Sequence, residues 1–311
     1  MTDNRTPTGF EHRVCPVCGE DRSSPLMEKA TLRLVRCGRC SMIYADPVDS
    51  QLASGAFYDR LSVPFYLSAD KLGSDYAPVR FDRELHWFRA WCRRGAVLDV
   101  GCSSGAFLFQ LRTRYPGDYT VAGMDVAGAA LDHAESRGIE AIRESFLECD
   151  FGGRRFDAVT FWAVIEHLVE PRKFLNKASA ILKPGGHCFI LVPNMNSLAV
   201  RLLGAKYRYI MPDHVNYFTA GTLRNFAATE PGLDVVRTGQ SHFNPIVILK
   251  DFRGRGERVP EEDRARLLKR TTAWKQNPLL RPARWAYACA EGSLRALGLA
   301  DNLVMVLRKK Q

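Results

Sequence analysis

The stretch Val97-Leu-Asp99-Val-Gly101-Cys-Ser-Ser-Gly105-Ala-Phe-Leu108 decides the fold of this chain. Apolar residues flank Asp99, small residues follow, and further apolar residues recur at helical spacing, which predicts a buried strand, a tight turn and a helix. Gly101 and Gly105 allow the backbone to turn sharply and to approach a ligand closely, because neither carries a Cβ. Free N–H groups at the helix start would give the turn an electropositive rim. By itself the pattern fits a simple packing junction as well as a binding site.

A second acid follows at the distance expected of a nucleotide-binding site. After the predicted helix, Tyr119–Asp125 has the pattern of a second strand that ends in an acid. An acid in this position, about 20 residues or more past the glycine turn, can accept hydrogen bonds from ribose hydroxyls. Val126 beside it could pack on a base. Two later blocks, Phe156–Leu168 and Ile181–Gly186, complete an ordered set.

In order and spacing these four blocks resemble the class I S-adenosylmethionine-dependent methyltransferases, and the resemblance runs from about Val97 to Val192. Nicotinamide-binding folds lack the run that begins with Glu-His-Leu at Glu166 and ends in Lys-Pro-Gly-Gly. One departure is Ser103, where the family usually has glycine. The resemblance implies an α/β fold, a Rossmann-like seven-stranded methyltransferase sheet with helices on both faces, and S-adenosylmethionine as the methyl donor.

The resemblance also implies which residues surround the donor. Asp99 and the turn after it would lie at the amino-acid end, Asp125 would bind the ribose hydroxyls, and Ser145 would lie at the adenine edge. Ser145 could instead cap a helix, and Phe161 could belong to the core. The residues expected at the donor site are Asp99, Gly101, Cys102, Ser103, Gly105, Asp125, Val126, Ser145, Phe146, Phe161 and Trp162.

Glu166, His167 and His214 are the candidates for chemistry on the acceptor side. A hydroxyl acceptor needs a nearby base, and histidine can take up a proton near neutral pH. In the family, His167 follows the fourth strand where acceptors enter, and His214 lies in a segment whose histidine commonly points toward the acceptor cleft. Each histidine could instead be a hydrogen-bonded structural residue, and Glu166 could orient the backbone or a histidine.

Two Cys-x2-Cys pairs precede the α/β region: Cys15 and Cys18, then, after 18 intervening residues, Cys37 and Cys40. This spacing lies in the range of zinc ribbons, in which two short knuckles bring four thiolates to one tetrahedral ion. Two disulfides or free thiols are the alternative, although no export signal is recognised. Because four cysteines leave no open position, we expect a structural rather than a catalytic Zn²⁺. Methyltransferases with an N-terminal zinc ribbon (type 11/23-like) extend the resemblance to about Phe226.

The sequence predicts three parts: a zinc-ribbon domain over 1–48, a linker and helical lid over 49–94, and a Rossmann-like methyltransferase domain over 95–311. The aromatic residues of 52–76 would suit either a lid over a pocket or a connector packed on the core. An insertion at about 245–300 would form a cap or an oligomer surface. Strands are expected at 96–100, 119–125, 139–142, 156–162, 186–192, 234–241 and 302–308, with helices near 104–114, 127–137, 171–182, 219–228, 261–272 and 282–297.

The 311 residues carry a formal net charge of +10, which favours anionic partners. The basic residues are scattered in small clusters, so we expect a solvated basic surface rather than a nucleic-acid footprint. No apolar run reaches membrane-spanning length and the first residues lack an apolar leader, so we expect a cytoplasmic protein.

By family analogy we expect an enzyme that methylates a small molecule. A sugar, nucleotide-linked or glycan-attached, is the favoured acceptor, in polysaccharide or secondary-metabolite biosynthesis. The alternative is an RNA or protein methyltransferase that holds a macromolecule through its ribbon and basic surface. A third hypothesis is a non-catalytic binding module that keeps only the fold. The sequence leaves open the acceptor's identity, the methylated atom (O, C or N) and the oligomeric state.

Overall fold

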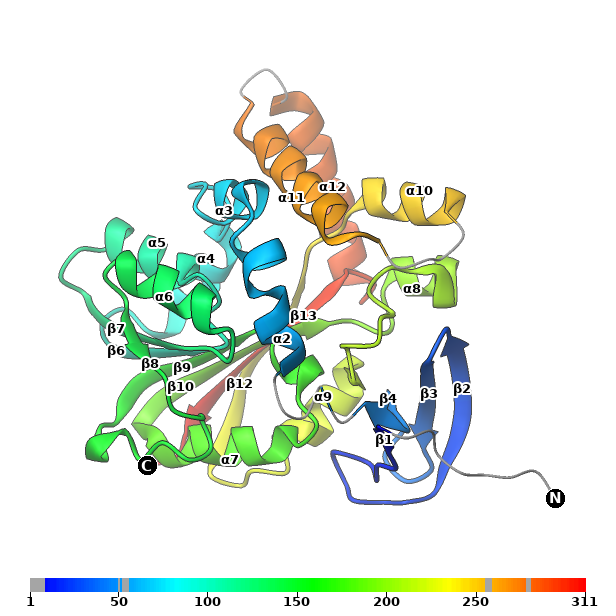
Figure 1. The fold of residues 1–311 in the computed structure, drawn as a ribbon, viewed down its shortest axis with the longest axis horizontal. Coiled ribbons are helices and arrows are strands. Elements are labelled where there is room, and N and C mark those ends of the chain that lie inside the picture. Colours follow the sequence, from blue (N-terminus) through cyan, green and yellow to red (C-terminus); the bar gives the residue numbers. More distant parts are fainter. Residues whose placement is uncertain (1–8, 50, 52–55, 255–258, 278–280) are drawn as a thin grey trace.

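A seven-stranded sheet forms the centre of the molecule in the computed structural model, which describes residues 9–49, 51, 56–254, 259–277 and 281–311 (Figure 1). The strand order is β12-β13-β10-β9-β6-β7-β8, which confirms the predicted methyltransferase sheet. Its strands are β6 (Gly95–Val100), β7 (Tyr119–Met124), β8 (Glu140–Ile142), β9 (Phe156–Trp162), β10 (Leu182–Pro193), β12 (Leu233–Ser241) and β13 (Asn302–Lys309).

Strand directions bring the candidate donor residues to one edge of the sheet. β6 pairs in parallel with β7 and β9, so that Asp99 lies opposite Gly123 on one side and Thr160 on the other. Because parallel strands have their carboxyl ends at the same edge, the turn after β6 and Asp125 after β7 lie close together. β13 runs antiparallel between β10 and β12, and the insertion with α10 to α12 separates β12 from β13 in the chain.

Helices cover both faces because successive residues of a strand point to opposite sides. On β10, Phe189 belongs to the hydrophobic cluster of one face and Ile190 to that of the other. The first face carries α4 (Asp82–Trp91), α5 (Ala106–Arg114) and α6 (Gly128–Ser136), and the second carries α7 (Pro171–Ile181) and α9 (Ala220–Ala227). The predicted helices are therefore confirmed, within a few residues at their ends.

The N-terminal strands form a small sheet that the main domain completes. β2 (Ser23–Lys29), β3 (Leu32–Cys37) and β4 (Ile43–Ala45) are antiparallel neighbours, and β11 (Asn216–Tyr217) adds a fourth strand beside β4. β1 (Phe10–Glu11) pairs with β5 (Val48–Asp49). Cys15, Val35 and Tyr44 belong to the same hydrophobic cluster as α7 and α9. The ribbon and the methyltransferase domain therefore share a hydrophobic core, although the sequence predicts a separate ribbon domain that ends at residue 48.

Helices from two distant parts of the chain form a cap above the carboxyl ends of the strands (Figure 1). From the linker come α2 (Ala56–Leu61), the π-helical turn Ser62–Tyr66 and α3 (Ala69–Asp75); from the insertion come α10 (Pro245–Arg253), α11 (Glu261–Gln276) and α12 (Arg281–Ala296). α11 packs on α3, where the hydroxyls of Ser74 and Thr272 are 2.8 Å apart. α12 is tied to α4 by an ion pair between Glu291 and Arg83.

The remaining helices are short. They are α8 (Leu198–Leu203) and the 3₁₀ turns Phe151–Gly153, Ile165–His167 and Gly204–Lys206. None of the helices in the described ranges is both long and apolar enough to span a bilayer.

Candidate active site

The turn after β6 is built from residues in the left-handed backbone conformation. Gly101, Ser103 and Gly105 have φ angles of +76°, +50° and +75°. The amides of Gly101 and Cys102 both donate to the carbonyl of Met124, over 2.7 and 2.9 Å, and tie the turn to β7. Ser103 adopts a conformation that costs an L-residue roughly 1–2 kcal/mol, which explains why glycine is usual here.

Close packing inside the protein leaves no room for a side chain at Gly101 or Gly105. A Cβ on Gly101 would lie 2.5 Å from Cγ2 of Val164, and one on Gly105 would lie 2.7 Å from the Cβ of Ala134 in α6. Gly101 lines the central cavity, whereas Gly105 does not. Gly105 therefore allows α5 to pack on α6, a role different from the close approach to a ligand that the sequence predicts.

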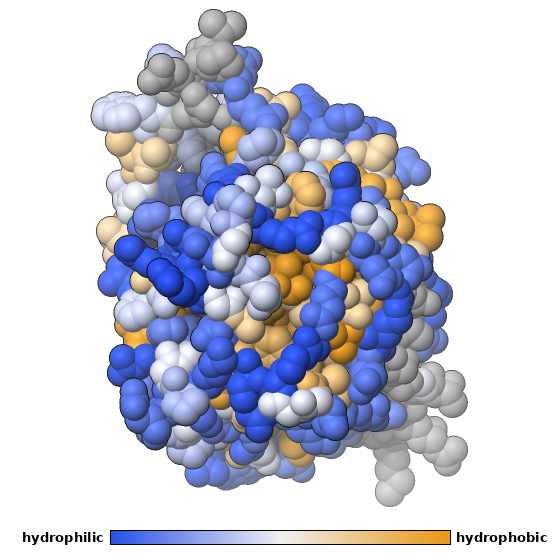
Figure 2. Space-filling model, turned by 90° about the vertical axis from the view of Figure 1, so that its left-hand side faces the viewer, coloured by the Kyte–Doolittle hydropathy of each residue, from blue (hydrophilic) through white to orange (hydrophobic). Residues whose placement is uncertain are grey.

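A cavity of about 1620 Å³ lies between the sheet and the cap. Typical small-molecule sites have roughly 300–1000 Å³, so this cavity has room for two small molecules. On one face of the molecule, Figure 2 shows hydrophobic side chains at the bottom of a hollow with a largely hydrophilic rim. Nine of the expected donor residues line the cavity: Asp99, Gly101, Cys102, Ser103, Asp125, Val126, Ser145, Phe146 and Trp162.

Backbone amides hold the carboxylate of Asp125 in place. One carboxylate oxygen accepts from the amide of Ser103 over 2.7 Å and the other accepts from the amide of Ala127 over 2.8 Å. Each oxygen has a further lone pair, so the carboxylate can also accept from two ligand hydroxyls. Val126 is 60% exposed and lines the cavity beside it. This arrangement suits a ribose diol with a base packed on Val126.

Asp99 is the second carboxylate at this end of the cavity. It is 3% exposed and accepts a 2.5 Å hydrogen bond from the hydroxyl of Thr160. Burial, and secondarily the nearby Asp125, raises the pKa of Asp99 to about 7. Within the described part of the chain, no Lys, Arg or His side chain pairs with either carboxylate. One buried and one half-buried acid without a cationic partner fit a ligand that brings positive charge, as S-adenosylmethionine does.

Alternation along β9 separates Phe161 from Trp162. Trp162 lines the cavity, and its indole lies edge-on to Phe107 at 5.3 Å. Phe161 is fully buried against Phe146 on the opposite face of the sheet and does not line the cavity. Phe161 is therefore a core residue, and the expectation that it faces the donor is corrected. Phe146 lines the cavity and stacks on Phe174 at 5.4 Å.

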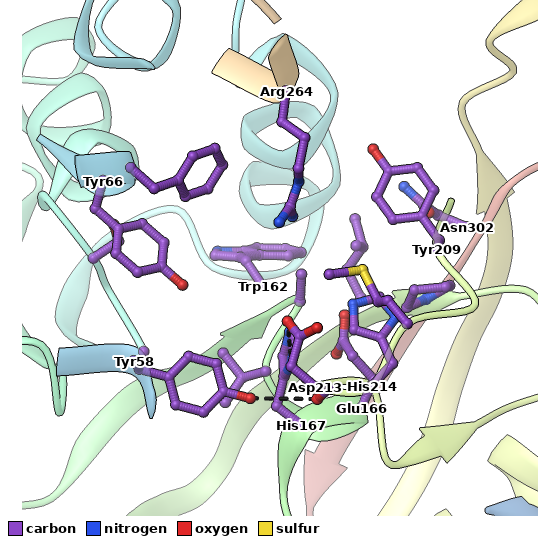
Figure 3. A pocket seen from close by; sticks show the side chains of 18 of the residues that line it. Tyr58, Tyr66, Trp162, Glu166, His167, Tyr209, Asp213, His214, Arg264 and Asn302 are labelled. Carbon is purple, nitrogen blue, oxygen red and sulfur yellow. Dashed lines mark hydrogen bonds and ion pairs between the residues drawn. The ribbon is translucent and has the colours of Figure 1, made fainter. Parts of the chain in front are cut away.

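The structure brings together Glu166, His167 and His214 (Figure 3). One ligand atom of each lies within 4.8 Å of the others, and the two imidazole centroids are 4.6 Å apart. His167 lies 2.8 Å, through Nδ1, from the carbonyl of Asp213, so Nδ1 carries the proton and Nε2 keeps a free lone pair. Both carboxylate oxygens of Glu166 lack a hydrogen-bond partner among the described residues, and so does Nδ1 of His214.

Burial keeps this group uncharged near neutral pH. It raises the pKa of Glu166 to about 8, with a smaller contribution from Asp213. Burial also lowers the pKa of His167. Burial, followed by the neighbouring His167 and the charge of Arg264, lowers the pKa of His214 well below its ordinary value. Neutral imidazoles with free nitrogen lone pairs can accept a proton, and the three side chains together could also hold a divalent ion.

The cap contributes aromatic and charged groups that the motifs did not identify. Tyr58 and Tyr66, from the linker, line the cavity, and the Tyr58 hydroxyl donates to the carbonyl of Asp213 over 3.3 Å. Arg264 of α11 reaches into the cavity, with its guanidinium 4.8 Å from the ring centroid of Phe65 (Figure 3). The linker therefore forms part of the cavity wall. This agrees with one of the two interpretations of its aromatic residues, a lid over a pocket. No sequence motif identified Arg264 as a residue of the cavity.

The four cysteines of the two knuckles form one cluster. Their sulfur atoms all lie within 4.8 Å of one another, and the pairs Cys15–Cys40 and Cys18–Cys37 are 3.5 Å apart. A tetrahedral zinc ion with Zn–S bonds near 2.3 Å requires sulfur separations of roughly 3.8 Å. The pairing in space crosses the knuckles and all four thiols are free, which fits a metal site rather than disulfides within each knuckle.

The strand order, the glycine turn, the two acids and the family match together define a class I S-adenosylmethionine-dependent methyltransferase fold. The chain belongs to the family described as "Methyltransferase domain", which matches residues 76–238. S-adenosylmethionine is the cofactor that this family and the geometry of the site both support.

Relatives and solved structures agree with this family. Ubiquinone biosynthesis O-methyltransferase of Alkalilimnicola ehrlichii is 32% identical over 146 residues, which are 43% of this chain and 56% of that protein. The protein of the same name from Caulobacter vibrioides is 32% identical over 173 residues, 50% of this chain and 66% of that protein. The match thus spans between about half and two thirds of these curated relatives. The solved structure of the (4+2)-cyclase SpnF is similar in fold, with a TM-score of 0.52, 16% identity, and coverage of 84% of this chain and 96% of that one.

Proposed function

We propose that this chain transfers a methyl group from S-adenosylmethionine to a small molecule, and that the acceptor is a sugar, free, nucleotide-linked or glycan-attached. One observation carries the proposal. A single cavity joins the two acids of the donor side, Asp99 and Asp125, to the buried group formed by Glu166, His167 and His214.

On the donor side, each residue has a distinct role. When bound, S-adenosylmethionine supplies a methyl group on a positively charged sulfur, which an acceptor can attack in line. Asp125 binds the ribose hydroxyls, and Asp99 stabilises the positively charged end. The indole of Trp162 lines the same cavity, and an indole face attracts a cation. Together these residues hold the donor in one orientation.

On the acceptor side, the chain must bind a hydroxyl or an acidic carbon and remove its proton. Nε2 of His167 is the favoured base, because the carbonyl of Asp213 holds the proton on Nδ1. With the donor bound, this nitrogen would take up the proton that the acceptor loses when it is methylated. Glu166, protonated near neutral pH, can donate a hydrogen bond to the acceptor.

The lining of the cavity supports a small acceptor with many hydroxyls. Tyr58 and Tyr66 lie on one side of the cavity, Tyr209 and Asn302 lie on the other, and Asp213 lies between the two sides (Figure 3). Rings can pack on the apolar face of a sugar while polar groups bind its hydroxyls. The curated relatives carry names of O-methyltransferases in ubiquinone biosynthesis, so a phenolic hydroxyl is the competing acceptor.

Donor binding and acceptor choice can be tested in sequence. Isothermal titration with S-adenosylhomocysteine should give one-to-one binding, and Asp125→Asn should weaken it roughly tenfold or more, because hydrogen bonds to a charged group are lost. Asp132→Asn, an exposed acid of α6, is the matched control and should bind as the wild type does. Labelled donor is then supplied with a panel of nucleotide sugars and with a catechol.

Each outcome decides a different part of the proposal. Transfer to a sugar confirms the acceptor class, and transfer to the catechol alone overturns it while keeping the methyltransferase. Failure of the wild type to bind S-adenosylhomocysteine overturns the proposed activity itself. Equal binding by the wild type and Asp125→Asn overturns the assignment of Asp125.

A further inference from the structure

The side chain of Arg13 leaves the zinc ribbon and enters the acceptor side of the main domain. It is 6% exposed although it carries a charge. Nη1 donates to the carbonyl of Val215 over 3.0 Å, and Nη2 donates to the carbonyl of Val169 over 2.5 Å and to the side-chain oxygen of Asn216 over 2.8 Å. These partners lie immediately after His214 and shortly after His167. One guanidinium therefore joins the two loops that carry the acceptor-side residues.

Strand pairing makes the same connection through the backbone. β4 follows Cys40 closely and pairs with β11, so that Tyr44 lies opposite Asn216. The amide of Ala45 donates to the carbonyl of Val215 over 2.9 Å. The segment just after His214 is therefore a strand of the ribbon sheet, and its position depends on the fold of the ribbon.

The two acceptor-side loops are also bound to each other at this point. The amide of Val215 donates to the carbonyl of Glu166 over 2.8 Å. The side-chain amide of Asn216 donates to the carbonyls of Ile165 and Leu168, over 2.8 and 2.7 Å. The loops that carry Glu166, His167 and His214 are thus joined by hydrogen bonds from the backbone of Val215 and the side chain of Asn216, and the guanidinium of Arg13 is the charged group among these contacts.

The ribbon holds Arg13 in turn. Its amide donates to the carboxylate of Asp46 over 3.0 Å, and its guanidinium lies 5.9 Å from the ring centroid of Tyr44. Cys15, two residues on, belongs to the four-cysteine cluster. The Arg13 side chain therefore starts two residues before the cluster that would hold the metal ion.

We propose that the zinc ribbon is a positioning device for the acceptor side of the active site, and that Arg13 is its positioning residue. The ribbon keeps the loops 165–169 and 213–216 in register, so that the imidazoles of His167 and His214 face each other. The donor side depends on the turn after β6 and on Asp125, which make no hydrogen bond to the ribbon in the described residues. The inference rests on the proposed function and assigns the ribbon a place within it.

The test compares Arg13→Gln, Arg13→Lys and Arg36→Gln in the full chain with its metal bound. Arg36 is an exposed arginine of β3 and serves as the matched control in the same ribbon. Three quantities are measured: affinity for S-adenosylhomocysteine, kcat/KM for the acceptor, and the ¹⁵N signals of the histidine imidazoles. The imidazole signals need no acceptor, because they report the tautomer and surroundings of each ring directly.

Arg13→Gln should shift the signals of His167 and His214 and lower kcat/KM roughly tenfold or more, since hydrogen bonds from a charged group are lost. Its affinity for S-adenosylhomocysteine should stay within about twofold of the wild type, and Arg13→Lys should recover part of the rate because it restores the charge. Arg36→Gln should change none of the three.

Two results would overturn the proposal. Unchanged imidazole signals and kinetics in Arg13→Gln would show that the guanidinium does not position the site. A parallel loss of S-adenosylhomocysteine binding would show a general structural role. If the wild type binds S-adenosylhomocysteine but methylates none of the acceptors, the proposed function fails, and the imidazole signals still decide whether the ribbon sets the geometry.

Discussion

The backbone amide of Ser103 donates a 2.7 Å hydrogen bond to the carboxylate of Asp125, and this bond joins the glycine turn to the end of the second strand. The same turn is tied to β7 through the carbonyl of Met124. The residues expected to contact the two ends of the donor are therefore held relative to one another by the protein itself. Preorganisation of this kind lowers the entropic cost of binding.

Gly101→Ala should be markedly destabilising because two costs combine. The added Cβ would lie 2.5 Å from Val164, and φ is +76°. Gly117→Ala is the matched control, since φ is +82° there and nothing lies within 4 Å of the added Cβ. We expect Gly117→Ala to lose roughly 1 kcal/mol of unfolding free energy and Gly101→Ala to lose about 1–3 kcal/mol more. Urea denaturation measures both, and Val164→Ala should partly rescue Gly101→Ala; equal losses in the two variants would contradict the overlap with Val164.

The stability of the protein should fall with rising pH because of Glu166. Burial raises the pKa of its carboxyl from 4.5 to about 8, so the folded protein retains a proton that the unfolded chain releases. Its contribution is therefore fully present below about pH 4.5 and is lost as pH rises to about 8, by at most about 1.4 kcal/mol per pH unit.

Glu166→Gln should remove this slope, because the amide does not titrate. Urea denaturation between pH 5 and 8 checks it, with the exposed Glu148→Gln as control. The stability of Glu166→Gln relative to the wild type should increase across this range. A difference that stays constant with pH would be incompatible with a raised pKa.

The purified protein should contain one zinc ion per chain, held by Cys15, Cys18, Cys37 and Cys40. Cys37→Ser should lose the metal and lower the thermal stability, because a structural zinc contributes folding free energy. Cys289→Ser, at an exposed cysteine outside the cluster, should keep it. Metal analysis of protein prepared without chelator counts the ions. No zinc would refute the ribbon site.

His167→Asn should lower kcat roughly 100-fold or more, because a positioned base contributes on the order of 10²–10⁴ to the rate. His214→Asn should have the smaller effect, since the carbonyl of Asp213 holds the proton of His167 on Nδ1 and leaves Nε2 free to accept one. Affinity for S-adenosylhomocysteine should remain close to wild type in both. His86→Asn, an exposed histidine of α4, is the control. Steady-state kinetics with the acceptor measure kcat for each variant. Wild-type rates in both variants would rule out histidine as the base.

Regular spacing in the sequence predicted most of the main domain. The strands and helices of the α/β region occur where apolar periodicity and glycine placed them, as β6 and α5 illustrate. The cysteine spacing likewise predicted the cluster that the structure contains. Phe161 was misplaced because alternation along β9 shows which residues share a face but not which face borders the cavity.

The sequence by itself determined the strand-turn-helix unit at Asp99, the positions of the strands along the chain and the two cysteine knuckles. These features depend on residues close together in the chain, where side-chain size and backbone preference act locally. Only the tertiary structure decided that β4 pairs with β11, that Arg13 reaches Val215, and that Arg264 enters the cavity. Such contacts join segments more than 160 residues apart. They arise from the packing of whole sheets and helices against each other, which no local spacing encodes.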